Sequence, residues 1–231
     1  WAGRGQLRVV FTPGGELLLS GDYGRFDGIP LTHAKPIAAK PGYSFDNPGS
    51  LWTVRTSHPT SGRNLQQGAS AKLVVPLSAT TTLTSLTAYR ESDYRFFIDA
   101  DATELTEQTS DVHDLQRQVS QELTLVRRTP KLTWIGGAFF FDDNNEAEVE
   151  IAVYQPRIQR RPFTTIGVNA WALFGQATYS VSRRMSLTGG VRYTKEQKDL
   201  DNTGGVYRLG TDILFDPATF YDYVETATYD A

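Results

Sequence analysis

Apolar and polar residues alternate along several segments of the chain with a period of two. From 185 to 194, Met185, Leu187, Gly189, Val191 and Tyr193 alternate with Ser186, Thr188, Gly190, Arg192 and Thr194. Segments 171–181 and 69–77 repeat this pattern, and Trp171 and Tyr179 lie near the two ends of one apolar row. Because successive side chains of a strand point to opposite faces, the pattern predicts strands with one apolar and one polar face.

The breaks between these segments alternate in length. Short breaks that are polar or contain proline occur at 13–15, 78–80, 127–131 and 182–184, and longer connections are predicted at about 28–64, 98–111, 143–169 and 199–220. The segments between them, of about ten to fifteen residues, are long enough to cross a membrane as tilted strands. This alternation predicts a transmembrane antiparallel β-barrel segment, with short periplasmic turns and long extracellular loops.

Segment 112–126 fits two structures. Its apolar residues Val112, Leu115, Val119, Leu123 and Val126 have spacings of three and four, which also fit an amphipathic helix. A strand would leave Arg117 and Gln121 on its apolar side. The periodicity alone leaves both structures open.

Composition narrows the possible functions. The 231 residues contain 23 Lys and Arg against 26 Asp and Glu, so no basic excess is present to follow a nucleic-acid backbone. Cysteine is absent, which excludes disulfides and thiolate metal sites. No apolar run approaches the roughly 20 residues of a transmembrane helix. The mean hydropathy of −0.37 does not argue against a membrane barrel, which shows only alternation.

Five segments resemble, in family order, strands of the TonB-dependent receptor barrel. They are LTSLTAYR at 83–90, QVSQELTL at 118–125, WIGGAFFF at 134–141, ALFGQATY at 172–179 and LTGGVRYTKE at 187–196. Each short match is weak alone, but together they form a specific signal beside independently placed turns. The resemblance favours a strand over 112–126, and LLLSGDY at 17–23 resembles a strand of the preceding hairpin.

The resemblance implies a barrel of about 22 strands with an N-terminal plug inside it. About eight strands and the start of a ninth at Tyr221 are expected here, so residues 1–231 are predicted to be a partial barrel domain. The plug and the C-terminal strands are expected to lie outside this sequence, whose ends at Trp1 and Ala231 are interpreted as cuts.

The resemblance also implies a function and a location. Receptors of this family lie in the outer membrane of Gram-negative bacteria, in contact with its lipid. They import a scarce nutrient, most commonly a ferric siderophore, with energy from the TonB–ExbB–ExbD complex, which acts through the N-terminal part. Two alternatives remain at this point: a passive, porin-like barrel and a soluble carbohydrate-binding β-sandwich.

Candidate ligand-binding residues lie in the predicted long connections. Arg157, Arg160 and Arg161 could bind an anionic chelate, because guanidinium groups recognise carboxylate and phosphate bidentately. Tyr43 and Trp52 could stack on a ligand. For the arginines, ordinary surface charge is the simpler interpretation. The aromatic residues can equally anchor in lipid headgroups or pack the loop.

Catalytic and metal-binding patterns are missing from the sequence. It contains no G-x-S-x-G, S-x-x-K, H-E-x-x-H, Walker or G-x-G-x-x-G motif, and its three histidines have spacings that no simple metal site uses. The acidic segment 142–146 lacks the spacing of a calcium loop and is predicted to be a polar loop. We therefore expect no enzyme activity, no metal site and no cofactor.

Overall fold

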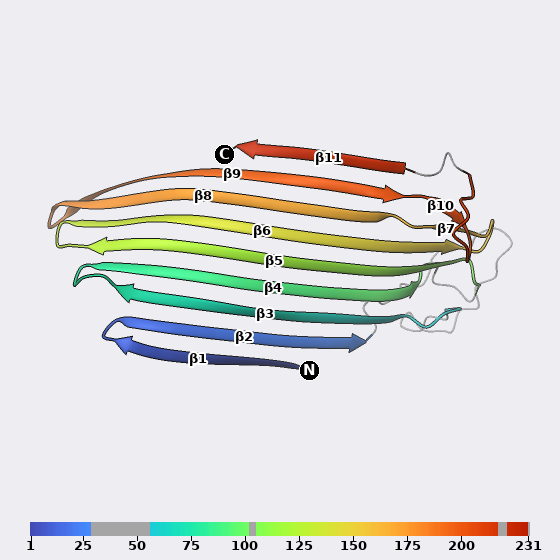
Figure 1. The fold of residues 1–231 in the computed structure, drawn as a ribbon, viewed down its shortest axis with the longest axis horizontal. Helices are drawn as coiled ribbons and strands as arrows, with labels where there is room; N and C mark the ends of the chain where they lie inside the picture. Colours follow the sequence, from blue (N-terminus) through green and yellow to red (C-terminus); the bar gives the residue numbers. More distant parts are fainter. Residues whose placement is uncertain (29–55, 102–104, 217–220, 231) are drawn as a thin grey trace.

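The protein forms one antiparallel sheet of long strands that lie side by side, with the two ends of the chain at opposite edges (Figure 1). The computed structural model describes residues 1–28, 56–101 and 105–216, and the backbone of 221–230. Nine strands follow one another across the sheet in the order β1-β2-β3-β4-β5-β6-β8-β9-β11. The expected eight strands and start of a ninth are therefore confirmed. The described residues form a single layer, unlike a sandwich of two facing sheets.

The bounds of the strands are as follows. They are β1 (Ala2–Thr12), β2 (Gly15–Gly28), β3 (Ser61–Pro76), β4 (Thr81–Asp99), β5 (Gln108–Arg128), β6 (Leu132–Val153), β7 (Ile158–Arg160), β8 (Phe163–Ser182), β9 (Met185–Gly204), β10 (Val206–Arg208) and β11 (Tyr221–Asp230). The described part of the chain contains no helix long and apolar enough to cross a membrane.

All four short turns predicted from the sequence join neighbouring strands at the same end of the sheet (Figure 1). In the first of them Gly14 has a φ of 79°. This left-handed conformation is readily available to glycine and costly for most other residues. From this end, β2, β4, β6 and β9 run toward the longer connections. The strands are therefore joined by short turns at one end of the sheet and by longer connections at the other.

The register aligns the apolar rows of neighbouring strands on one face. Val75, Leu83, Leu125, Gly136, Gly175 and Val191 form one continuous row of cross-strand partners over six strands. The next row contains Leu73, Ser85, Leu123, Ala138, Leu173 and Tyr193. We call the face that carries these rows the apolar-band face, and the opposite one the polar face.

Aromatic residues border the apolar band on the side away from the short turns. They are Tyr23, Tyr89, Phe140, Trp171 and Tyr193, and the rings of Trp171 and Tyr193 have centroids 5.4 Å apart. Trp134 and Tyr179 lie on the same face near the short turns. On β8, the apolar band therefore extends from Tyr179 to Trp171, with an aromatic residue at each border.

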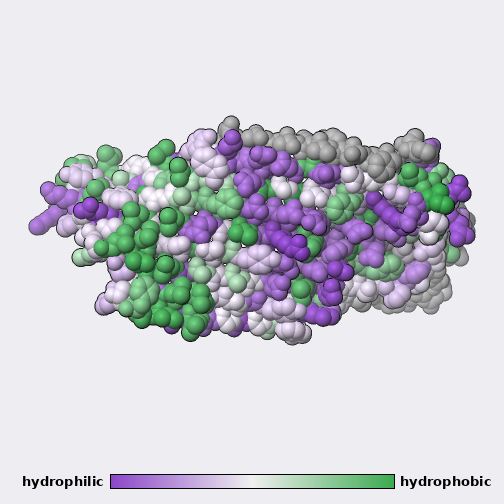
Figure 2. Space-filling model, in the orientation of Figure 1, coloured by the Kyte–Doolittle hydropathy of each residue, from purple (hydrophilic) through white to green (hydrophobic). Residues whose placement is uncertain are grey.

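The sheet buries little apolar surface of its own. Among the residues whose burial is described, the buried hydrophobic ones are Ala152, Ala170 and Ala172, whereas Val191 is 76% exposed and Leu187 71% exposed. In the view of Figure 2, hydrophobic residues gather toward the end with the short turns and hydrophilic residues dominate the middle. A contiguous exposed apolar surface of this kind is typical of a face that meets a membrane or another protein.

The strands extend further than the alternation predicted. β6 continues to Val153 and β8 begins at Phe163, so most of the predicted connection 143–169 is strand. The prediction that 142–146 is a polar loop was wrong, because this segment lies inside β6 and pairs with β5 and β8. Directly above the aromatic border, residues 142–145 put polar side chains on both faces of β6, so the alternation disappears while the backbone ladder continues.

Segment 112–126 is a strand, as the family resemblance indicated. Gln121 and Arg117, the two polar residues that the alternation left on its apolar side, both have hydrogen-bond partners. Gln121 donates to Ser85 Oγ (2.9 Å) and to the carbonyl of Glu122 (3.1 Å), and it accepts from the Thr87 hydroxyl. Arg117 lies beyond the apolar band and contacts Glu91 (3.2 Å). A polar group on an apolar surface is tolerated when its hydrogen bonds are made.

Candidate functional site

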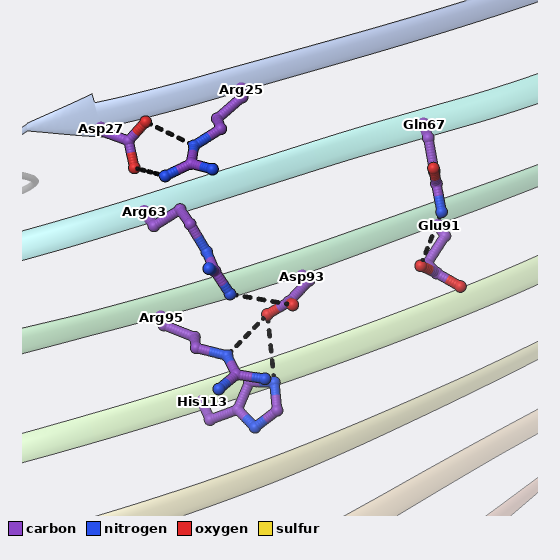
Figure 3. A network of polar contacts seen from close by, with 8 residues as sticks. All are labelled: Arg25, Asp27, Arg63, Gln67, Glu91, Asp93, Arg95 and His113. Carbon is purple, nitrogen blue, oxygen red and sulfur yellow. Dashed lines mark hydrogen bonds and ion pairs between the residues drawn. The ribbon is translucent and has the colours of Figure 1, made fainter.

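Above the aromatic border, the apolar-band face carries a network of charged side chains (Figure 3). Asp93 on β4 is its centre: Arg95 and His113 contact its Oδ1 at 3.1 Å, and Arg63 on β3 contacts its Oδ2 at 3.5 Å. The three partners come from three adjacent strands. His113 contributes a charge only when it is protonated.

The environment of Asp93 favours its ionised form. Burial alone would raise its pKa, but the hydrogen bond from Arg95 and the charges of Arg95, His113 and Arg63 together lower the pKa below its ordinary value. A carboxylate with cationic partners stays ionised more readily than a free one.

The other carboxylates of this network are also occupied. Glu91 accepts hydrogen bonds from the Tyr89 hydroxyl (2.6 Å), from Gln67 (2.9 Å) and from Arg117 (3.2 Å). Asp27 holds Arg25 through two hydrogen bonds of 2.6 and 2.9 Å. Each carboxylate of the network therefore has at least one cationic partner, and the contacts from Arg63 and His113 to Asp93 tie neighbouring strands together. Its arginines are already committed to carboxylates.

The polar face carries its own contacts. Arg90 on β4 reaches across β3 to Asp22 on β2 at 3.0 Å. It passes over Gly68, where an added Cβ would lie 3.0 Å from the Arg90 guanidinium. Glycine at this position thus allows an ion pair between strands that are not neighbours.

A second contact on the polar face stacks three residues. The ring of Phe174 lies over Gly137, where an added Cβ would come within 2.5 Å of the ring. The Arg192 guanidinium lies 5.8 Å from the centroid of the same ring. A cation over an aromatic face is stabilised by the quadrupole of the ring, so Arg192 is held against the wall of the sheet.

At the end of the sheet away from the short turns, β7 and β10 form a small two-stranded ribbon that the sequence did not predict. β7 pairs with β6 and β10 pairs with β7. Gln159 in β7 is 1% exposed, and its amide donates to the Thr211 carbonyl (3.1 Å) and accepts from the Gly210 N–H (2.9 Å). A buried amide with both ends satisfied fixes the ribbon against the turn that follows β10.

Arg161, one of the predicted ligand-binding residues, has carboxylate partners on β6 and in the turn after β10. It contacts Glu150 at 3.2 Å and Asp212 at 2.6 Å, and it lies 5.2 Å from the centroid of the Tyr207 ring. The hydrogen bond with Asp212, together with the two negative charges, raises its pKa above the ordinary value. These contacts give Arg161 a structural role.

The other predicted ligand-binding residues lie elsewhere. Arg157 is exposed in the turn before β7, with a φ of 68°, and its carbonyl accepts from the Leu209 N–H (2.9 Å). Arg160 is exposed on β7. Tyr43 and Trp52 lie outside the described residues. Arg208 on β10 is brought beside these arginines by a pairing between segments distant in sequence, which no local pattern indicated.

Ser57, His58 and Asp99 meet near the start of β3 but do not have the arrangement of a nucleophilic triad. The fully buried Asp99 accepts from the Ser57 hydroxyl (2.8 Å) and from the His58 backbone N–H (3.0 Å). In a triad the carboxylate orients the imidazole, and the imidazole activates the hydroxyl. Here the carboxylate binds the hydroxyl and the backbone, and it anchors the segment that leads into β3.

Comparisons with known proteins agree with this architecture. The family model described as TonB dependent receptor-like, beta-barrel, matches residues 8–225. The fold is similar to the crystal structure of the ferric yersiniabactin uptake receptor FyuA from Yersinia pestis, with a TM-score of 0.68 and 14% sequence identity. The similarity covers 100% of this chain and 33% of that chain, so this chain spans about a third of the length of FyuA. No curated protein matches the sequence.

The family model spans nearly all of the chain, and nine strands follow one another across the sheet in chain order. The family is one of transport receptors and not of enzymes. The chain therefore belongs to the TonB-dependent receptor family, as part of its β-barrel domain.

Proposed function

We propose that this chain is part of the wall of an outer-membrane receptor that imports a scarce nutrient with energy supplied through TonB. The observation that carries the proposal is the family match over residues 8–225, on a sheet whose apolar band has aromatic borders. The most suitable cargo is a ferric siderophore or a similar iron chelate, which is the kind of cargo named for the structural neighbour FyuA.

The apolar band supports a location in a membrane. The segment from Trp171 to Tyr179 is nine residues long. About 9–11 residues of a tilted strand cross the hydrocarbon core of a bilayer. Aromatic residues at both borders are typical of the two interfaces of a membrane. In this arrangement, Leu187 and Val191 contact lipid, and the charged network around Asp93 lies outside the hydrocarbon.

The polar face supports a lumen. Thr188 hydrogen-bonds Thr178 (2.9 Å), and Arg90, Asp22 and Arg192 lie on the same side. These groups would be costly in lipid and are compatible with water or with a polar domain inside the barrel. The short turns would face the periplasm, and the β7–β10 ribbon would lie at the extracellular mouth.

Ligand contacts are proposed at that mouth. Arg157 and Arg160 are exposed there and could bind an anionic chelate. Tyr43 and Trp52 remain proposed stacking residues of the first long connection. Energy would come from the TonB–ExbB–ExbD complex, through the part of the receptor that precedes this barrel segment.

Uptake in cells tests the proposal. Bacteria that lack the receptor gene should take up less radioactive iron from spent iron-limited medium of the same species, and the intact gene should restore the uptake. Deleting the TonB gene should abolish the same component. Receptor-dependent uptake that persists without TonB would instead support a passive, porin-like barrel.

A further inference from the structure

The β7–β10 ribbon presents two arginines on one face. Arg160 pairs with both Ile151 on β6 and Val206 on β10, and Arg208 pairs with Ile158. Cross-strand partners share a face, so Arg160 and Arg208 lie on the same side as Ile151, which is the polar face. They are diagonal neighbours, a relation that separates residues by about 7–8 Å.

Neither guanidinium is neutralised by the described part of the chain. Arg160 and Arg208 are exposed, and they make no ion pair with another described side chain. The nearby positions on this face of β5 and β6 carry no carboxylate: they are Ser110, Val112, Val149, Ile151 and Val153. Two like charges in this arrangement repel each other, and a bound anion would relieve the repulsion.

Contacts on the opposite face of the ribbon fix the backbone that carries the two arginines. Gln159 and Tyr207 alternate with Arg160 and Arg208 along the two strands, so they face away from them. Gln159 is fixed by its two backbone partners, and Arg161 by Glu150 and Asp212. The backbone beneath the two exposed guanidiniums is thus braced by satisfied polar contacts, which reduces the entropy lost when they bind a ligand.

We propose that Arg160 and Arg208 form an anion-binding site for a ligand that carries carboxylate groups, at the mouth of the barrel on its luminal side. The inference rests on the proposed function and names its substrate class. Two planar guanidiniums at this separation suit a ligand with two or more carboxylates, because each fork can take one of them bidentately. Arg161 is not part of the site, since it is already paired with Glu150 and Asp212.

Binding of citrate, used as a simple tricarboxylate probe, tests the site. The full-length receptor in detergent is titrated with citrate at constant ionic strength, and the affinity is measured by calorimetry. Replacing both residues in Arg160→Gln/Arg208→Gln should weaken binding about tenfold or more, the effect of losing at least one charge-assisted contact. The matched control is Arg183→Gln/Arg184→Gln, which removes the same charge at an exposed turn on the opposite end of the sheet. It should change the affinity less than about twofold.

Two results would overturn the site: equal weakening in both double variants, or no citrate binding by the unaltered receptor. Iron uptake in cells separates this inference from the proposed function. If uptake requires TonB but citrate binding is unaffected by Arg160→Gln/Arg208→Gln, the site is wrong and the transport function stands. If that variant loses citrate binding while uptake is independent of TonB, the site stands and the transport function is wrong.

Discussion

In β9, the segment from Met185 to Tyr193 and the segment from Lys195 to Gly204 lie on one continuous strand with one hydrogen-bond ladder. The first segment alternates apolar and polar residues. The second is polar on both faces: Lys198 pairs with Glu196 at 2.9 Å on one side, and Gln197 donates to Asp199 (3.1 Å) on the other.

The same contrast divides the whole wall. Toward the short turns, one face presents Leu73, Leu123 and Leu173 in a shared row. Toward the ribbon, that face presents the network around Asp93. The backbone forms the same hydrogen-bond ladder in both parts, because the polar groups of every strand must be hydrogen-bonded. The side chains change with the surroundings of each level, which in the proposed orientation are lipid below the aromatic border and water above it.

Sidedness is the sharpest test of this comparison, because its outcome is all or none. Cysteine placed by Asn144→Cys in the full-length receptor should react with an impermeant thiol reagent on intact cells. Cysteine placed by Arg184→Cys, in a short turn, should react only after the outer membrane is opened. The sequence contains no cysteine that would add background from this segment. The reverse labelling pattern would invert the orientation proposed here.

A charge in the apolar band should have the next largest effect. Val191→Arg should lower the free energy of unfolding in lipid vesicles by roughly 2–4 kcal/mol, the cost of a cation near the middle of a bilayer. Val191 is 76% exposed on the apolar-band face, so no partner in the sheet would shield the new charge. Urea titration in vesicles measures the change.

Three matched variants show whether depth and face set that cost. Val191→Leu keeps the position apolar, Thr188→Arg places the cation on the polar face, and Gln197→Arg places it on the same face above the aromatic border. All three should be tolerated much better than Val191→Arg. Similar losses for Val191→Arg and Gln197→Arg would remove the distinction between the two halves.

Packing on the polar face predicts a smaller effect. Gly137→Ala would bring a methyl group 2.5 Å from Phe174 and 2.7 Å from the Leu123 carbonyl, so it should cost about 1–3 kcal/mol through overpacking. The adjacent Gly136→Ala meets its nearest atom, on Trp134, at 3.6 Å, which is ordinary contact. The two glycines have the same local sequence context but lie on opposite faces. Equal stabilities of the two variants in vesicles would contradict the packing described for Phe174.

The network around Asp93 should make the smallest contribution to the stability of the receptor, and it should make it only above acidic pH. Because its pKa is lowered in the folded protein, its stabilising effect is fully present above the ordinary value of 3.8 and is lost as the pH falls through the lower folded value. Asp93→Asn should therefore destabilise the receptor at neutral pH by at most about 1 kcal/mol, as is typical of exposed ion pairs. Its difference from the unaltered receptor should shrink in acid. A difference that grows on acidification would show that the sign of the pKa shift is wrong.

The sequence by itself determined the strands of the apolar band and the turns that join them. The alternation at 185–194 and 171–181 reports a face in contact with an apolar environment, and the breaks at 13–15 and 182–184 mark where the chain reverses. Both are local signals, since a period of two and a turn each depend only on residues close in sequence.

Tertiary structure alone decided the upper wall and the ribbon. In segment 142–146 the side chains are polar on both faces, so no alternation distinguishes a strand from a loop, and only pairing with β5 and β8 makes it a strand. Arg160 and Arg208 share a face because β10 pairs with β7. The partners of Arg161 likewise come from β6 and from the turn after β10. Such contacts depend on register between distant segments, which is set by the assembled sheet and leaves no local pattern in the sequence.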